Sequence, residues 1–226
     1  MGISIQIHLP EKLYLRDPEQ TDLGRRILDF SIKLIDELGF EKFTFKKLAT
    51  AIGSTEASVY RYFENKHKLL IYLVSWYWRW LEYQIDYQIH NVEDKKRAIE
   101  LAIGVLADSI KYDPNFSHID EVTLHRIVVE ESSKAFLTKQ VNNDRKDGLF
   151  SGYRSLCLKL ASLLTEFNNN YPYPKALAST VVEASHQQIF FATHLPDLTD
   201  LKVQEEDTTQ IARFLEDLVF RVLDES

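Results

Sequence analysis

The sequence predicts an all-α protein of about nine helices, with a short helical domain near its N-terminus and a larger helical domain after it. Apolar residues recur at intervals of three and four in almost every stretch between turns, which is the period of an α-helix. Glycine or proline ends several of these stretches, as at Gly39, Gly53 and Pro114. Strand-like alternation occurs only over residues 3–9, and a lone strand has no partner with which to form a sheet.

Residues 1–20 precede the first predicted helix and form an N-terminal arm. Their alternating start favours an extended conformation, whereas Pro10 and Pro18 bracket a stretch that can pack as a tail. Both conformations and the role of the arm are left open. The first helix is predicted over residues 22–38, capped by Thr21 or Asp22 and ended by Gly39.

Two short helices follow, over residues 45–52 and 56–63, with a tight turn between them. Gly53 allows the turn because glycine adopts positive φ without a steric penalty, and Ser54 or Thr55 can cap the second helix. Helical spacing places Phe45, Leu48, Ala49, Ile52, Val59 and Phe63 inward and leaves Ser58, Arg61 and Tyr62 pointing outward. This pattern is a helix-turn-helix, whose second helix lies in the major groove of DNA.

The same stretch resembles the DNA-binding domain of the TetR (tetracycline-repressor) family of bacterial transcriptional regulators. The resemblance covers about residues 21–70 and rests on Thr44, Leu48–Ala49, Gly53, Tyr60–Arg61–Tyr62–Phe63, Asn65–Lys66 and Leu69–Leu70. It implies a TetR-type helix-turn-helix DNA-binding domain at 21–67 and a helical ligand-binding and dimerisation domain at 68–226; the N-terminal arm at 1–20 is not a general feature of the family. The implied function is that of a ligand-responsive regulator, most often a repressor, that binds a near-palindromic operator as a dimer.

Side chains on the outer face of the second short helix are the candidates for contact with DNA. Arg61 can pair with guanine and Glu56 can accept a hydrogen bond from cytosine, although either can equally be a solvated surface charge. The resemblance implies phosphate contacts from Thr44, Tyr60, Tyr62 and Lys66, and base contacts from Lys46, Glu56, Ala57, Ser58 and Arg61; Thr55 lies on the same face. Packing under the motif is the alternative role for Tyr60 and Tyr62.

The larger domain is predicted to contain helices over residues 66–90, 94–111, 117–140 (one or two), 145–167, 175–194 and 208–223. The resemblance implies that a ligand enters between the middle helices and moves the 66–90 helix. Tyr77 and Trp78 lie off the apolar stripe of that helix, so they are candidates for lining a cavity or an interface. Aromatic walls suit a small apolar or aromatic effector.

His118, Glu121 and His125 share one face of a predicted helix. They are candidate metal ligands, but His118 and His125 are two turns apart, and a solvated face is the favoured interpretation, so no metal is predicted. His125 remains a candidate ligand contact. No nucleophile–base set or glycine-rich phosphate loop is present, which argues against an enzyme, and no cofactor is expected.

Helices 175–194 and 208–223 are apolar enough to leave one face free, and Ala176, Ala184 and Ala192 would allow close helix approach. The resemblance implies that these two helices form a four-helix bundle with their copies in a homodimer. Two DNA-reading heads about 34–36 Å apart would then read one near-palindrome. The alternative is a TetR-fold protein with a non-transcriptional role, as a protein-binding or chromosome-organising adaptor.

Charge and cysteine content agree with this prediction. The net charge is −7, but residues 21–70 carry +2, which places a mildly basic head on an acidic remainder. Cys157 is the only cysteine, so no intrachain disulfide can form, as is usual in the cytoplasm. No run of 18 apolar residues exists, and no membrane span is expected.

Overall fold

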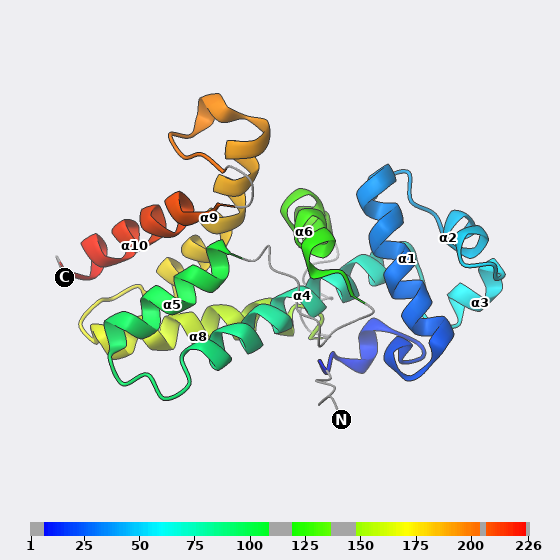
Figure 1. The fold of residues 1–226 in the computed structure, drawn as a ribbon. Helices are drawn as coiled ribbons and strands as arrows, with labels where there is room; N and C mark the ends of the chain where they lie inside the picture. Colours follow the sequence, from blue (N-terminus) through cyan, green and yellow to red (C-terminus); the bar gives the residue numbers. More distant parts are fainter. Residues whose placement is uncertain (1–6, 109–118, 137–147, 204–206, 225–226) are drawn as a thin grey trace. The chain divides into compact units, whose positions relative to one another are not determined.

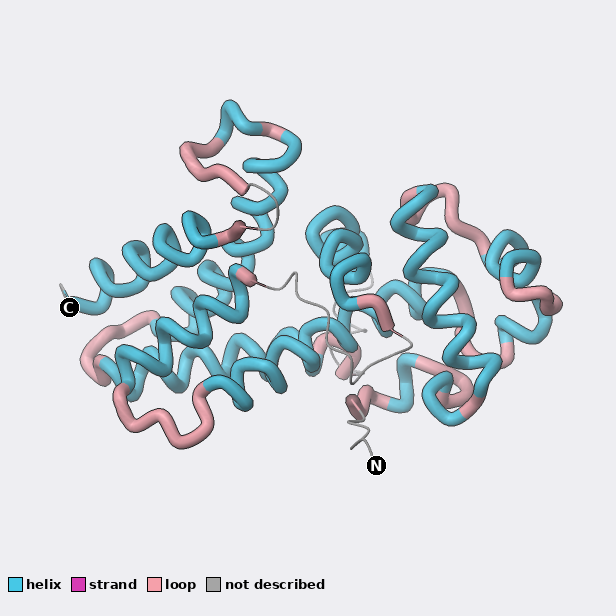
Figure 2. Tube along the Cα trace, in the orientation of Figure 1, coloured by secondary structure: helices cyan, strands magenta, loops and turns pink. Residues whose placement is uncertain are grey.

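The computed structural model describes residues 7–108, 119–136, 148–203 and 207–224, and these parts are α-helical without a strand (Figures 1 and 2). The predicted all-α fold class is confirmed. The described α-helices are α1 (Asp22–Leu38), α2 (Phe45–Ala51), α3 (Glu56–Tyr60), α4 (Lys66–Gln88), α5 (Lys95–Ala107), α6 (Glu121–Phe136), α8 (Ser151–Phe167), α9 (Pro174–His194) and α10 (Thr209–Asp224).

The helix boundaries follow local signals in the sequence. The side chain of Thr21 accepts a hydrogen bond from the Gly24 amide at the start of α1, and Gly39, at φ 76°, ends that helix. Helix α3 ends at Tyr60, which is three residues earlier than predicted. Residues 109–111, 117, 118, 137–140 and 145–147 of the predicted helices lie outside the described residues.

The chain divides into two compact units, and each is considered separately. The first contains residues 1–77 and 111–152, and the second contains residues 78–110 and 153–226. Helix α4 is continuous across residues 77 and 78 and so contributes to both. The boundary predicted from the sequence, between a DNA-binding domain that ends at residue 67 and a ligand-binding and dimerisation domain that begins at residue 68, divides the chain by function and not by compactness. It stays a prediction.

In the first unit, residues 7–20 are a packed tail. They contain two short 3-10 helices, η1 (Glu11–Leu13) and η2 (Pro18–Gln20), and the side chains of Leu13 and Pro18 are buried. Gly24 on α1 has no room for a side chain, because a Cβ there would lie 2.2 Å from the carbonyl oxygen of Pro18. Close packing of the tail against α1 therefore depends on this glycine.

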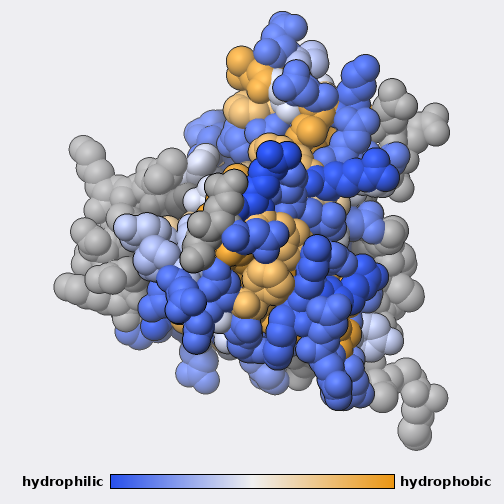
Figure 3. Space-filling view, turned by 90° about the vertical axis from the view of Figure 1, so that its left-hand side faces the viewer, coloured by the Kyte–Doolittle hydropathy of each residue, from blue (hydrophilic) through white to orange (hydrophobic). Residues whose placement is uncertain are grey.

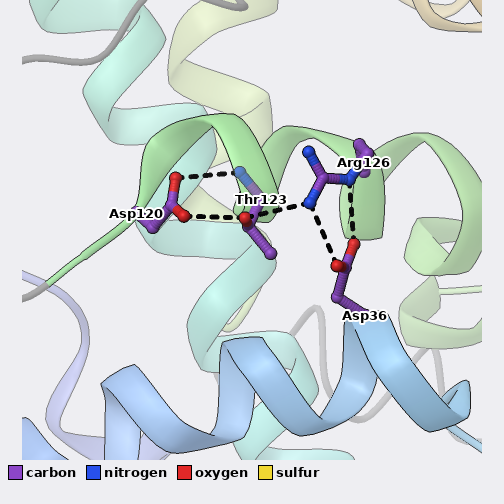
Figure 4. Close-up of polar contacts among 4 residues, drawn as sticks. All are labelled: Asp36, Asp120, Thr123 and Arg126. Atoms are coloured by element: carbon purple, nitrogen blue, oxygen red, sulfur yellow. Dashed lines mark hydrogen bonds and ion pairs between the residues drawn. The ribbon is translucent and has the colours of Figure 1, made fainter.

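Helix α6 packs against α1 in the same unit through a polar network (Figure 4). The guanidinium of Arg126 donates to both carboxylate oxygens of Asp36, at 2.9 and 3.0 Å, and to Thr123 Oγ1 at 3.0 Å. Thr123 in turn donates to Asp120, which caps the start of α6. This two-point pairing fixes both the position and the rotation of Arg126 over the last turns of α1.

In the second unit, α10 packs against α5 and α9. An aromatic cluster lies deeper in this unit, where the ring of Trp78 meets the rings of Tyr153 and His186 edge-on at 5.2 and 4.9 Å. Burial lowers the pKa of His186 to about 4, against the smaller opposing effect of the Val182 carbonyl. His186 is therefore a neutral core residue at physiological pH. Among the described helices, none is both long enough and apolar enough to cross a membrane.

We expect His186 to make the protein acid-sensitive. Because its pKa is lower in the folded state than in the unfolded state, stability is full above about pH 6.5 and falls as the pH drops towards 4, by about 3 kcal/mol in total. His186→Asn removes the titrating ring, so its urea-unfolding free energy should depend less on pH over this range than that of the wild type. His90→Asn, at an exposed position, is the control and should retain the wild-type dependence.

Candidate nucleic-acid interface

The α2–turn–α3 segment is held in shape by side-chain caps. Thr44 accepts from the Lys47 amide at the start of α2, and Thr55 accepts from the Ser58 amide at the start of α3. Gly53, at φ 60°, makes the turn between the two helices. The side chain of Arg26 on α1 donates to the Ile52 carbonyl, a contact that the sequence analysis did not anticipate.

The outer face of this segment is polar and accessible. Beneath it, Val59 and Phe63 are fully buried, as predicted from their spacing. Seven of the ten predicted DNA-contacting side chains are exposed, namely Thr44, Lys46, Thr55, Glu56, Ala57, Tyr60 and Arg61; Ser58 and Lys66 are half-buried, and Tyr62 is buried. The structure therefore brings the exposed side chains together on the surface of one small substructure.

Tyr60 and Tyr62 differ in their surroundings. Tyr60 is 47% exposed and packs its ring against Phe45, with ring centres 5.0 Å apart, so its hydroxyl end remains accessible. Tyr62 is only 2% exposed, and its hydroxyl lies 2.7 Å from Thr21 Oγ1. The expectation that Tyr62 points outward is wrong: Tyr62 follows the buried Val59 by three residues, a spacing that places both on one helix face. The turn continues past Tyr60, since the Val59 carbonyl accepts from the amides of both Tyr62 and Phe63. Tyr62 instead joins the start of α1 to the end of α3.

Lys66 is half-buried at the start of α4, and its ammonium group forms hydrogen bonds within the protein. It donates to the carbonyl oxygens of Phe40, Glu41 and Phe43, at 2.9, 3.0 and 3.2 Å. It also lies over the Phe40 ring, 4.6 Å from the ring centre. These three bonds use all three donors of a lysine, so a phosphate contact by Lys66 would have to displace one of them. The geometry gives Lys66 a positioning role for the loop between α1 and α2.

The same loop is also held by α6. Glu131 Oε1 accepts from the Phe40 amide at 3.1 Å, and the other oxygen of Glu131 pairs with Lys134 at 2.6 Å. Lys134 also lies 3.6 Å from the carboxylate of Glu41. The loop that leads into Thr44 and α2 is therefore fixed by Lys66 and by α6, and no local sequence pattern indicated either contact.

The predicted ligand contacts are buried core residues. Tyr77 and His125, both in the first unit, are joined by a hydrogen bond of 2.7 Å between the phenol oxygen and Nδ1. Trp78 is 3% exposed and belongs to the aromatic cluster of the second unit. Helix α4 is buried on all sides over residues 69–78. Tyr77 and Trp78 are therefore buried although they lie off the apolar stripe of the helix.

The favoured interpretation of the His118, Glu121 and His125 face is wrong for two of its residues. Glu121 is fully buried and His125 is 3% exposed, so neither lies on a solvated face. His118 lies outside the described residues. No group of three potential metal ligands occurs within the part of the chain that the structure describes.

Comparison with known proteins identifies the helix-turn-helix. The family described as "Bacterial regulatory proteins, tetR family" matches residues 27–73, which include α2, α3 and the first turns of α4. This match spans about a fifth of the chain, and over it the chain is similar to the tetR family. Comparison with curated protein sequences finds no match.

Solved structures show that the tetR fold extends over most of the chain. A tetR-family regulatory protein from Rhodococcus RHA1 is 13% identical, covers 90% of this chain and 97% of its own, and has a TM-score of 0.63. The superantigen PfiT is 15% identical, with 93% and 100% coverage and a TM-score of 0.61. AibR, solved in complex with isovaleryl coenzyme A and operator DNA, is 14% identical, with 87% and 98% coverage and a TM-score of 0.59.

We expect Lys66→Met to loosen the loop at residues 39–44. The substitution removes three charge-assisted hydrogen bonds, so the free energy of unfolding should fall by about 2 kcal/mol. The amide of Phe43, which bonds to the Gly39 carbonyl, should exchange with deuterium faster than in the wild type. Lys33→Met, which removes an exposed pair with Asp29 and a contact with the Phe30 ring on α1, is the matched control. Unchanged exchange at Phe43 would refute the positioning role.

Proposed function

We propose that this protein is a sequence-specific DNA-binding transcriptional regulator of the tetR family, acting as a ligand-responsive repressor. The observation that carries the proposal is the accessible polar face of α3, supported from beneath by buried Val59 and Phe63. A rigid helix with exposed donors and acceptors is the element that reads base edges in the major groove.

The residues divide into two roles in this proposal. Lys46, Thr55, Glu56, Ala57, Ser58 and Arg61 face the bases, and Thr44 and Tyr60 contact phosphates. Lys66 and Tyr62 act from beneath by fixing the loop before α2 and the end of α3. This division revises the roles that family resemblance alone implies for Lys66 and Tyr62.

The operator would be read by a homodimer formed through α9 and α10. Exposed apolar side chains on and beside these helices support this proposal: Phe214 is 38% exposed on α10, and Leu198, just after α9, is 61% exposed. Figure 3 faces the side on which Figure 1 labels α5, α8 and α10, and it shows apolar residues at the surface among hydrophilic ones. One copy of α3 contacts too few base pairs to select a genomic site, whereas two copies read a near-palindrome.

The effector would be a small apolar or aromatic molecule. The first unit buries a polar pair, Tyr77 and His125, among apolar and aromatic side chains, and a few placed polar groups in an apolar surround are typical of ligand sites. The isovaleryl coenzyme A bound by AibR also carries a small apolar acyl group, which agrees with this class.

A second candidate function is that of a TetR-fold adaptor that binds protein instead of an operator. The structural likeness to PfiT, described as a superantigen, supports the adaptor as a second candidate, because one fold can carry unrelated functions. A protein-binding role would make no use of the α3 face for duplex selection, so one experiment separates the two candidates.

Selection from a pool of random duplexes with the full-length protein is that experiment. Enrichment of one near-palindromic sequence is expected for the regulator. Failure to enrich any sequence at low and physiological salt would exclude the proposed function and favour the adaptor.

We expect Arg61→Ala to relax sequence preference at one base pair of each half-site. The lost contact with a base edge should reduce discrimination there by about 1–3 kcal/mol while other positions stay selective. Tyr60→Phe removes only a hydroxyl assigned to a phosphate, so it should weaken binding to all sequences alike. Competition titrations with single-base variants of the selected operator measure both effects, and an unchanged preference in Arg61→Ala would refute the base contact.

We expect Phe214→Glu to disrupt the homodimer. A charge placed on the apolar face of α10 should shift the molecular mass measured by light scattering towards that of a monomer and weaken binding to the full operator more than to a half-site. Leu158→Glu is the matched control, because Leu158 is 41% exposed on α8, outside the proposed interface. A Phe214→Glu protein that stays dimeric would contradict the assignment of α9 and α10.

A further inference from the structure

We propose that Arg16 in the N-terminal tail binds a DNA phosphate beside the operator half-site, which extends the DNA interface beyond the helix-turn-helix. This inference rests on the proposed function. It assigns a role to a segment that lies outside residues 27–73, which are those matched by the family.

The tail is attached directly to the end of the recognition helix α3. The Leu15 amide donates to the Tyr62 carbonyl at 2.7 Å, one residue after Arg61. The Tyr62 hydroxyl is bonded to Thr21, where α1 begins, and Tyr14 meets the Tyr72 ring edge-on at 6.1 Å. Residues 14–21 therefore keep a fixed position relative to the base-reading side chains.

Arg16 is held in place at the surface of this segment. Its side chain is exposed, and its guanidinium lies over the Tyr62 ring, 5.5 Å from the ring centre. A cation stacked on an aromatic face keeps its N–H groups directed outward, and arginine matches phosphate geometry with a fork of donors. Arg16 is therefore pre-organised without an ion pair.

A survey of the other cations near α3 supports this assignment. Arg25 pairs with Asp22, Lys33 pairs with Asp29, and Lys66 is used by three carbonyls. Arg26 donates to the Ile52 carbonyl and Lys47 to the Lys42 carbonyl, and Lys12 and Lys68 also have interaction partners.

Within the described residues 7–77, the cations with neither an ion pair nor a hydrogen bond from the side chain are Arg16, Lys42, Lys46 and Arg61. Three of these lie in the helix-turn-helix or in the loop before it. The fourth, Arg16, belongs to the tail and lies over the ring of Tyr62, the residue that follows Arg61 in the sequence.

The net charge of the tail does not by itself favour binding to DNA. Lys12 and Arg16 are outnumbered there by Glu11, Asp17 and Glu19. The carboxylate nearest in sequence is already used, since Asp17 accepts from the Glu19 amide at 2.9 Å and from Gln20 Nε2 at 3.0 Å. The proposal therefore concerns one guanidinium and one phosphate per subunit, and it predicts no general attraction of DNA to the tail.

The test compares salt dependence of binding in full-length variants, with the operator obtained by duplex selection. Each neutralised phosphate contributes about 0.9 to the slope of log K against log salt, so Arg16→Ala should lower the slope by about 1.8 for a dimer and weaken binding about fivefold or more at fixed salt. Arg16→Lys keeps the charge and should retain the slope. Lys33→Ala, with an equal loss of charge on α1, should leave it unchanged.

A shortened operator locates the contact. Removing the base pairs that flank the half-sites should weaken wild-type binding and lower its slope, but should change neither quantity further in Arg16→Ala. Replacing the flanking base pairs by others of equal length should leave the Arg16→Ala effect unchanged, because a phosphate contact does not read sequence.

Several results would overturn the assignment. An Arg16→Ala protein with the wild-type slope, or with weaker binding explained by a lower melting temperature at an unchanged slope, would leave the tail with only a structural role. An effect that depends on the flanking sequence would replace the phosphate contact by a base contact. If the wild type selects no duplex, both this inference and the proposed function fail; if it does and Arg16→Ala matches it, only this inference fails.

Discussion

A helix of five residues cannot hold its own shape in water, and α3 is five residues long. The position of the proposed DNA-reading face therefore depends on contacts made by residues distant in the sequence. Val59 and Phe63 anchor the segment in the core, and the Phe63 ring meets the Tyr72 ring on α4 edge-on at 5.4 Å. Tyr62 closes the other end, where it meets Thr21 and the tail.

The position of the loop before α2 likewise depends on contacts with residues distant in the sequence. The loop contains no repeating structure of its own, and its carbonyl and amide groups are satisfied by Lys66 of α4 and Glu131 of α6. Helix α6 is in turn held on α1 by the two hydrogen bonds between Arg126 and Asp36. A polar contact with two bonds tolerates little sliding, so displacement of α6 must either carry the end of α1 with it or break the pair.

The sequence correctly predicted the features of the fold that are determined by residues close together in the sequence. Threonine caps, Gly39 and helical spacing determine α1, and both of its ends were predicted correctly. Tyr62 was misplaced although it follows the buried Val59 by three residues, and its bond to Thr21 joins residues 41 positions apart. The hydrogen bonds from Lys66 to the carbonyls of Phe40, Glu41 and Phe43 join residues 23 to 26 positions apart. A local sequence pattern does not predict such a contact. Burial of Glu121 and His125 was missed for the same reason, since it is set by packing between elements.

Packing also gives α6 a particular place in the ligand-responsive mechanism that we propose. His125, bonded to Tyr77, precedes Arg126, which is bonded to Asp36 on α1. Successive residues of a helix point in directions about 100° apart, so one turn of α6 faces both the buried polar pair and the support of the helix-turn-helix. All of these residues belong to the same compact unit. A ligand that disturbed the Tyr77–His125 pair would therefore act on the DNA-reading head through α6, within one packed unit and without a hinge between them.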